Sequence, residues 1–232
     1  MKIVDSINWS HVHGSLNEKG FATVPAFFSK EECSNLASLY LQSKLYRSVI
    51  NMKRHRFGEG EYKYFAYPLP AVVQNVRQHI YAHLTPLANE WMQQLGLDTS
   101  FPAEHPTLIK RCHQYGQTRP TPLILKYEKG GYNTLHQDLY GEVYFPLQVV
   151  FLLSEPKKDF EGGEFVMIEQ LPRAQSKATV INLQMGDALI FATNFRPVVG
   201  TRGYYRAKVK HGVSPLISGT RHALGIIFHD AN

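Results

Sequence analysis

His136 and Asp138 are separated by one residue in the stretch "TLHQDLYGE", a spacing suited to metal chemistry. Side chains at positions i and i+2 of a β-strand share a face, whereas Gln137 between them should point away. Two histidines and one carboxylate can hold Fe(II) and leave its remaining coordination positions open. The second histidine should lie on a neighbouring strand, and His211 follows the extended run "YYRAKV".

Arg221 stands ten residues after His211, where another apolar run begins. A buried guanidinium can bind a carboxylate through two parallel hydrogen bonds, as a dicarboxylate co-substrate beside iron would require. Each of these signals is weak alone, because a histidine and an aspartate two positions apart often occur by chance. Their order within an extended half of the chain makes the combination strong.

The first half of the chain has helical periodicity. Ser29 followed by Glu32 fits a capping box and predicts a helix over about 29–43. A second helical region should begin near Pro70, break at Pro86 and continue to about Leu95. The stretch 51–70 between the helices is the best candidate for a long functional loop or hairpin.

After about Pro120 the pattern becomes extended, with short apolar runs separated by turn residues, which indicates a sandwich or small barrel. The runs are "PLILKY", "FPLQVVFLL", "GEFVMI", "TVINL", "ALIFAT", "YYRAKV" and "ALGIIF". We therefore expect an α+β fold and a single domain over residues 1–232, with helical support and substrate loops in about 1–118 and a β core in about 119–232. No internal repeat or Gly/Ser linker divides the chain.

With these residues in place, the sequence resembles the Fe(II)/2-oxoglutarate-dependent dioxygenases, whose core is a double-stranded β-helix, or jelly roll. "FEGGEFVMIEQ" and "MGDALIF" are similar to core strands of the prolyl-hydroxylase branch. The resemblance implies that His136, Asp138 and His211 bind Fe(II), that Arg221 binds the distal carboxylate of 2-oxoglutarate, and that O2 is the second co-substrate. It also implies an N-terminal helical layer against the jelly roll.

"LILKYEKGGYNTLHQD" is similar to the AlkB-type nucleic-acid demethylases and implies that Tyr127 donates a hydrogen bond to 2-oxoglutarate. A tyrosine packed in the core is the alternative. AlkB-type enzymes carry a second arginine six residues after the first, where this chain has Ile227. As a whole the chain looks like a bacterial family of 2-oxoglutarate oxygenases predicted to act on damaged nucleic-acid bases.

Candidate substrate residues lie in two further segments. Thr193 to Lys210 is basic and aromatic without an acid, and Arg202 and Tyr204 within it could meet phosphates and bases. A solvated basic loop is the alternative interpretation. "QLPRAQSK" contributes Arg173 and Gln175, which could address substrate from a loop or cap a turn. Tyr140, two residues after Asp138, is a further candidate.

The composition is that of an ordinary globular protein, with 44% hydrophobic and 19% charged residues. The net charge of +6 favours polyanionic partners without requiring them. We expect no membrane partner and a cytoplasmic location, because Met1 to Trp9 lacks leader features and no run approaches the roughly 18 apolar residues of a membrane helix. Cys33 and Cys112 should be reduced, buried thiols.

Three hypotheses follow for the function. The first is a dioxygenase that demethylates or hydroxylates damaged nucleic-acid bases, presented in a single strand or flipped out of a duplex. The second is a hydroxylase of a protein side chain or a small metabolite, which "GGEF" and "GDALIF" favour. The third is a non-enzymatic jelly-roll module that binds metal. The pattern does not choose between DNA and RNA or indicate an oligomeric state.

Overall fold

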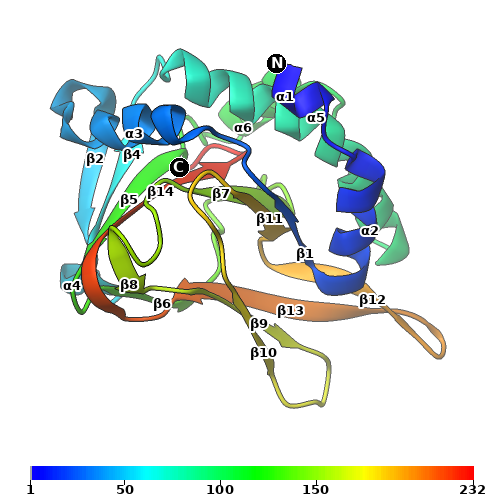
Figure 1. The fold of residues 1–232 in the computed structure, drawn as a ribbon. Helices are drawn as coiled ribbons and strands as arrows, with labels where there is room; N and C mark the ends of the chain where they lie inside the picture. The colour runs from blue at the N-terminus through cyan, green and yellow to red at the C-terminus, as the bar shows by residue number, and fades with distance from the viewer. Residues whose placement is uncertain (1) are drawn as a thin grey trace.

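The computed structural model describes residues 2–232, with side chains from residue 4 onward, as two antiparallel β-sheets stacked face to face (Figure 1). Most helices gather over the outer side of the upper sheet, whereas α4 (Met52–His55) lies beside the edge of the lower sheet, whose underside carries no helix in this view. This is the α+β jelly roll with an N-terminal helical layer that the sequence predicts. No helix among the described residues is long and apolar enough to cross a membrane.

The helices come from the first half of the chain. They are α1 (Lys2–Asp5), α2 (Trp9–Lys19), α3 (Lys30–Ser38), α4 (Met52–His55), α5 (Ala71–Gln94) and α6 (His105–Gln114), with 3-10 turns η1 (Leu39–Leu41) and η2 (Ser43–Leu45). The predicted capping box is present, because the Ser29 hydroxyl accepts from Glu32 N and the Glu32 carboxylate accepts from Ser29 N. The break predicted at Pro86 is wrong, since α5 runs through it. Packing of the buried face of α5 outweighs the one backbone hydrogen bond that proline removes.

The large sheet has the order β1-β11-β7-β14-β5-β4-β2, with β8 paired to β14. Its strands are β1 (Phe21–Val24), β2 (Tyr46–Asn51), β4 (Glu61–Phe65), β5 (Leu123–Glu128), β7 (Leu147–Leu152), β8 (Phe160–Gly162), β11 (Ala188–Ala192) and β14 (Leu216–Ile227). Its central strands β7 and β11 are buried along their whole length, because helices cover one face and the small sheet the other.

The small sheet has the order β10-β9-β13-β6-β3, with β12 paired to β13. Its strands are β3 (Gly58–Glu59), β6 (Tyr132–His136), β9 (Phe165–Gln170), β10 (Lys177–Ile181), β12 (Phe195–Gly200) and β13 (Gly203–Val213). Along β13, Ala207, Val209 and His211 are buried, whereas Lys208 and Lys210 are exposed. This period of two places one face against the large sheet and the other in solvent.

All seven predicted extended runs coincide with strands, but the first half of the chain is less helical than its pattern indicates. It adds β1, β2 and β4 to the large sheet and β3 to the edge of the small sheet. The stretch 51–70 is the hairpin expected there, with α4 and β3 inserted between β2 and β4. The two cysteines are free and buried, as expected.

Candidate metal and co-substrate site

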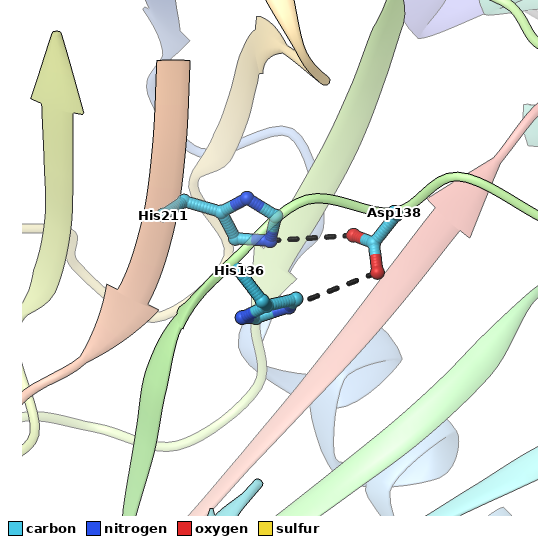
Figure 2. A group of neighbouring side chains, drawn as sticks. All are labelled: His136, Asp138 and His211. Atoms are coloured by element: carbon cyan, nitrogen blue, oxygen red, sulfur yellow. Dashed lines mark ion pairs between the residues drawn. The ribbon is translucent and has the colours of Figure 1, made fainter. Parts of the chain in front are cut away.

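Two neighbouring strands of the small sheet bring the candidate metal ligands together. His136 at the end of β6 is the register partner of His211 on β13, so the two imidazoles face the same way. Asp138 follows β6 by two residues and turns its carboxylate toward both rings (Figure 2). Gln137 turns elsewhere, donating to Asn194 and to the backbone carbonyl of Val209.

The geometry of this group is that of a chelating site. One Asp138 carboxylate oxygen lies 3.7 Å from His136 Nε2 and the other lies 3.3 Å from His211 Nε2. The ligand atoms of the three residues all lie within 4.8 Å of one another, and they form the one such group of His, Cys, Asp or Glu found in the described residues. Two imidazoles and one carboxylate are the donor set of a facial Fe(II) site.

The protonation states of the group suit a divalent cation. Burial alone would raise the pKa of Asp138, but hydrogen bonding and charge from His211, with His136 and Tyr140 adding to them, hold that pKa below its ordinary value. Burial, together with the neighbouring His136, lowers the pKa of His211. The carboxylate is therefore ionised and His211 neutral near pH 7, the forms in which both residues bind metals.

A hydrogen-bond chain supports the carboxylate from the opposite side. The Tyr140 hydroxyl donates to Asp138 Oδ1 at 2.6 Å, and Tyr64 on β4 donates to the Tyr140 oxygen at 3.1 Å. His136 Nδ1 lies 2.7 Å from the Thr134 carbonyl, so it carries the proton and leaves Nε2 free to face Asp138. Tyr140 thus orients Asp138, a candidate metal ligand. Its contact with substrate stays a prediction.

A cavity of about 220 Å³ between the sheets contains this group. The two histidines and Asp138 lie on its small-sheet side, and Arg221 and Tyr127 lie on its large-sheet side. Its remaining wall is largely aromatic and aliphatic, with the residues Phe57, Tyr62, Tyr64, Leu123, Leu125, Tyr140 and Ile227. The cavity is thus a mostly apolar chamber with polar groups at defined points, typical of a small-molecule site.

Arg221 and Tyr127 are direct register partners on β14 and β5 and face the cavity together. Both are buried, with Arg221 3% exposed and Tyr127 0% exposed. Neither Arg221 Nε nor the Tyr127 hydroxyl has a hydrogen-bond partner, although Asn133 lies close enough to the hydroxyl to affect its pKa. Burial raises the pKa of Tyr127 to about 12 and lowers that of Arg221.

Such unpartnered polar atoms are costly in a folded protein, at about 1–3 kcal/mol each, and more when the group is charged. A carboxylate with a hydrogen-bond acceptor beside it would satisfy both groups. The cavity therefore fits a dicarboxylate ligand at this end, next to the His-Asp-His group.

Four of the predicted substrate residues lie outside the cavity. Arg173 and Gln175 are exposed in the loop between β9 and β10, and Arg202 and Tyr204 are exposed at the tip of the β12–β13 hairpin. The structure does not bring these four together with the His-Asp-His group, and their contact with a substrate stays a prediction.

The sequence pattern did not predict the aromatic wall of the cavity. Phe57, Tyr62 and Tyr64 come from the hairpin between β2 and β4, which reaches the site because β4 pairs with β5. The alternation in "EYKYF" could have indicated a strand with Tyr62 and Tyr64 on one face. Nothing local in the sequence showed that this face would meet residues 136–140.

The fold is that of the 2-oxoglutarate- and Fe(II)-dependent oxygenases. A prolyl-4-hydroxylase from Pseudomonas putida superposes with a TM-score of 0.56 over 97% of this chain and 99% of its own, at 14% identity. A 2OG-Fe(II) oxygenase-family oxidoreductase from Burkholderia pseudomallei superposes with a TM-score of 0.56 over 98% of this chain and 95% of its own, at 16% identity.

Sequence comparison then narrows the class to a family. Residues 60–231 match the family Oxygenase-NA, described as an oxygenase catalysing oxidative methylation of damaged DNA. The uncharacterized proteins Rv2227 and MT2286, from two strains of Mycobacterium tuberculosis, are each 47% identical over 167 residues, which is 72% of this chain and 72% of theirs. The chain belongs to the Oxygenase-NA family and is an enzyme of the 2OG-Fe(II) oxygenase class.

Proposed function

We propose that this protein is an Fe(II)- and 2-oxoglutarate-dependent dioxygenase that oxidises methylated nucleic-acid bases and so removes the methyl group. The observation that carries the co-substrate half of this proposal is the pair of unpartnered polar groups, Arg221 Nε and the Tyr127 hydroxyl, buried in the cavity that holds the His-Asp-His group. The family description supports the nucleic-acid half.

The residues present fit the two groups that the reaction needs. His136, Asp138 and His211 would hold Fe(II), while Arg221 would bind the distal carboxylate of 2-oxoglutarate and Tyr127 would donate to it. Bound iron and 2-oxoglutarate supply the oxidation of a substrate C–H bond by O2, with release of succinate and carbon dioxide. The chain contributes ligand orientation through Tyr140 and a largely apolar chamber that keeps water from the reacting centre.

The opposite end of the cavity supports a flat, weakly polar substrate. Tyr64, Leu123 and Ile227 form one cluster of buried side chains there, and Tyr62 and Tyr140 pack against it. An extruded base is read by stacking between aromatic and apolar side chains, and these residues offer such surfaces. Ile227 occupies the place of the second arginine of AlkB-type enzymes, so this end recognises its ligand without that charge.

Removal of a methyl group is the reaction that this chemistry supports. An oxygenase inserts oxygen into a methyl C–H bond, and a hydroxymethyl group on nitrogen breaks down to formaldehyde and the free base. Adding a methyl group would need a donor that no part of the proposed site provides for. We therefore interpret the "oxidative methylation" of the family description as oxidative removal of a methyl group.

A second candidate is hydroxylation of a protein side chain, which the shared fold with prolyl-4-hydroxylases favours. The same chamber could hold a proline ring in place of a base. The third hypothesis, a metal-binding module without turnover, conflicts with membership of a family of oxygenases.

The test is mass spectrometry of products from a panel of methylated oligonucleotides, proline-containing peptides and free amino acids, each supplied with Fe(II), 2-oxoglutarate and O2. We expect loss of a methyl group from an oligonucleotide, with formaldehyde and succinate in equal amounts. The His136→Ala variant serves as the inactive control. A peptide gaining one oxygen while every oligonucleotide stays unchanged would replace this proposal with the second candidate.

A further inference from the structure

The basic, aromatic segment Thr193 to Lys210 divides between the two faces of the small sheet. Lys208 and Lys210 are the register partners of Gln170 and Ile168 on β9, whereas His211 pairs with the buried Met167. Because directly opposed residues share a face, the lysines point away from the cavity that His211 lines.

On the inner face, the one cation of this segment is already engaged. Arg196 is 5% exposed, and its Nε lies 2.5 Å from the Glu169 carboxylate. Its other nitrogens donate to the carbonyls of Asn17 and Glu18 at the end of α2. Arg196 thus ties the hairpin to the helical layer and is not available to an external partner.

The outer face, by contrast, carries positive charge without compensation. Arg206, Lys208 and Lys210 are exposed along β13 at alternate positions. None of the three makes an ion pair with a described residue, although Arg206 lies 4.7 Å above the Phe195 ring. Glu169 is the one acidic residue in β9, β10, β12 and β13, and it points to the inner face to meet Arg196.

Apolar side chains lie exposed among these cations. Val180 on β10 is 57% exposed, Val199 on β12 is 76% exposed and Tyr204 on β13 is 45% exposed. No helix among the described residues covers this face where β9, β10 and β13 lie, which Figure 1 shows as the underside of the lower sheet. The outer face of the small sheet therefore combines positive charges with exposed apolar side chains.

We propose that the outer face of the small sheet, centred on Arg206, Lys208 and Lys210, binds the backbone of a single-stranded nucleic acid that flanks the base to be oxidised. This inference deepens the proposed function and rests on it for the identity of the partner. Side chains on one face of a strand recur about every 6.6 Å, so the row presents evenly spaced positive charges to successive phosphates. The exposed Val199 and Tyr204 suit the bases of a single strand better than a duplex, which conceals its bases.

The order of strands leads from this face toward the cavity. β13 neighbours β6, and β6 neighbours β3 at the sheet edge. Leu135 on β6 is 45% exposed, and Phe57, just before β3, lines the cavity while remaining 45% exposed. Adjacent strands lie about 4.8 Å apart, so a bound strand needs to cross only about 10 Å from β13 to reach this edge.

The experiment compares Lys208→Glu/Lys210→Glu with Lys44→Glu/Lys110→Glu, which makes the same change in net charge on exposed lysines of η2 and α6. Binding of a fluorescent single-stranded oligonucleotide is followed by anisotropy over a range of salt concentrations, without turnover. We expect the outer-face variant to bind about tenfold or more weakly at low salt and its salt slope to fall by about 1.4, since each phosphate contact on a single strand contributes about 0.7. The control variant should retain the wild-type slope.

Several outcomes would overturn this proposal. Equal binding and equal slopes for the two variants would place the nucleic acid elsewhere. Tighter binding of a duplex of the same sequence would contradict a single-stranded partner. Failure of wild-type protein to bind any oligonucleotide, or preference for a poly-glutamate peptide, would exclude a nucleic-acid partner for this face. The Lys208→Ala/Lys210→Ala variant repeats the comparison if charge reversal alters the melting temperature.

Succinate release with a methylated mononucleoside separates this inference from the proposed function, because one nucleoside cannot span the cavity and the outer face. We expect the Lys208→Glu/Lys210→Glu variant to equal wild type in that assay. If this variant turns over the mononucleoside and also binds the oligonucleotide as wild type does, the proposed outer-face site is wrong and the proposed function stands. If the variant binds the oligonucleotide more weakly but wild type turns over no methylated substrate, the proposed function is wrong and the outer-face site stands.

Discussion

Two buried arginines, Arg77 on α5 beside the end of β14 and Arg221 in the middle of that strand, have contrasting surroundings. Arg77 on α5 is 0% exposed and donates to Asp230, to the Tyr67 hydroxyl and to the backbone carbonyl at position 227. Arg221 is 3% exposed, and its Nε has no partner. One guanidinium is satisfied by the protein itself, and the other faces a cavity.

This difference separates a structural role from a ligand-binding role. Asp230 compensates the charge of Arg77, so that the pair joins α5 to the end of β14. Arg221 carries a desolvation cost that its contacts with the Tyr127 and Phe160 rings offset only in part, and a bound carboxylate would offset the rest. A substitution of Arg77 should therefore lower the stability of the fold, and a substitution of Arg221 should weaken the binding of 2-oxoglutarate.

The largest effect on activity should come from a substitution in the His-Asp-His group, which shares the cavity with Arg221. Replacing Asp138 with Ala removes the carboxylate between His136 and His211, and we expect succinate formation to fall by at least about a thousandfold. The fold should persist, because Asp138 lies outside the strands and lines the cavity. Metal-dependent succinate release and circular dichroism measure the two properties. Asp98→Ala, at an exposed carboxylate, is the control, and substantial turnover in Asp138→Ala would contradict the assignment.

Arg77→Met should give the largest loss of stability. It leaves Asp230 buried without its partner, and we expect the free energy of unfolding to fall by about 3–5 kcal/mol, measured by urea denaturation. Arg221→Met should be neutral or stabilising, since it removes a buried charge that makes no ion pair with a described residue. Equal destabilisation by both substitutions would contradict the distinction between the two arginines. Arg77→Met/Asp230→Asn should recover part of the loss.

Arg221→Met should instead change the use of 2-oxoglutarate. Loss of a charge-assisted bidentate contact worth about 1.5–3 kcal/mol should raise the KM for 2-oxoglutarate by roughly 10- to 150-fold. Initial rates of succinate release over a range of 2-oxoglutarate concentrations measure this change. Arg221→Lys, which keeps the charge without the planar fork, should lie between the variant and wild type. An unchanged KM would remove Arg221 from the co-substrate site.

Acid should weaken the Arg77 region through its neighbour His105. Burial, and the charge of Arg77 after it, lower the pKa of His105 to about 3. Between about pH 6.5 and pH 3 the unfolded chain therefore takes up a proton there and the folded chain does not, so stability falls as the pH falls. We expect this histidine to cost about 2 kcal/mol between pH 7 and pH 5. Urea denaturation of wild type and His105→Gln at both pH values should show a smaller loss in the variant.

The smallest effect should follow removal of a single hydroxyl. Tyr140→Phe frees Asp138 from the hydrogen bond that orients it, and we expect metal affinity to fall roughly tenfold. Tyr67→Phe, which removes a donor to Asp230, should cost about 1 kcal/mol of stability and leave metal affinity unchanged. Metal titration followed by calorimetry distinguishes them. A loss of stability without a change in metal affinity would make Tyr140 a packing residue.

Several features of the fold and the site could be predicted because they depend on local pattern. The period of two along "YYRAKV" and the capping box at Ser29 reflect backbone geometry, which few residues decide. The grouping of His136 with Asp138 was predicted from the same period and is confirmed, although Asp138 lies two residues beyond the end of β6. The break at Pro86 was predicted on equally local grounds and was wrong, because packing of the long helix α5 outweighed the proline.

The sequence by itself determined which side chains could bind a metal and a carboxylate, since residue type and spacing set that chemistry. Only the tertiary structure decided that β13 carries His211 on one face and the unpaired lysines on the other, in contact with different surroundings. The structure alone also distinguished Arg77 from Arg221, because the two differ in the partners that distant segments bring to them. Such partners depend on long-range pairing of strands and packing of helices, which no local pattern specifies.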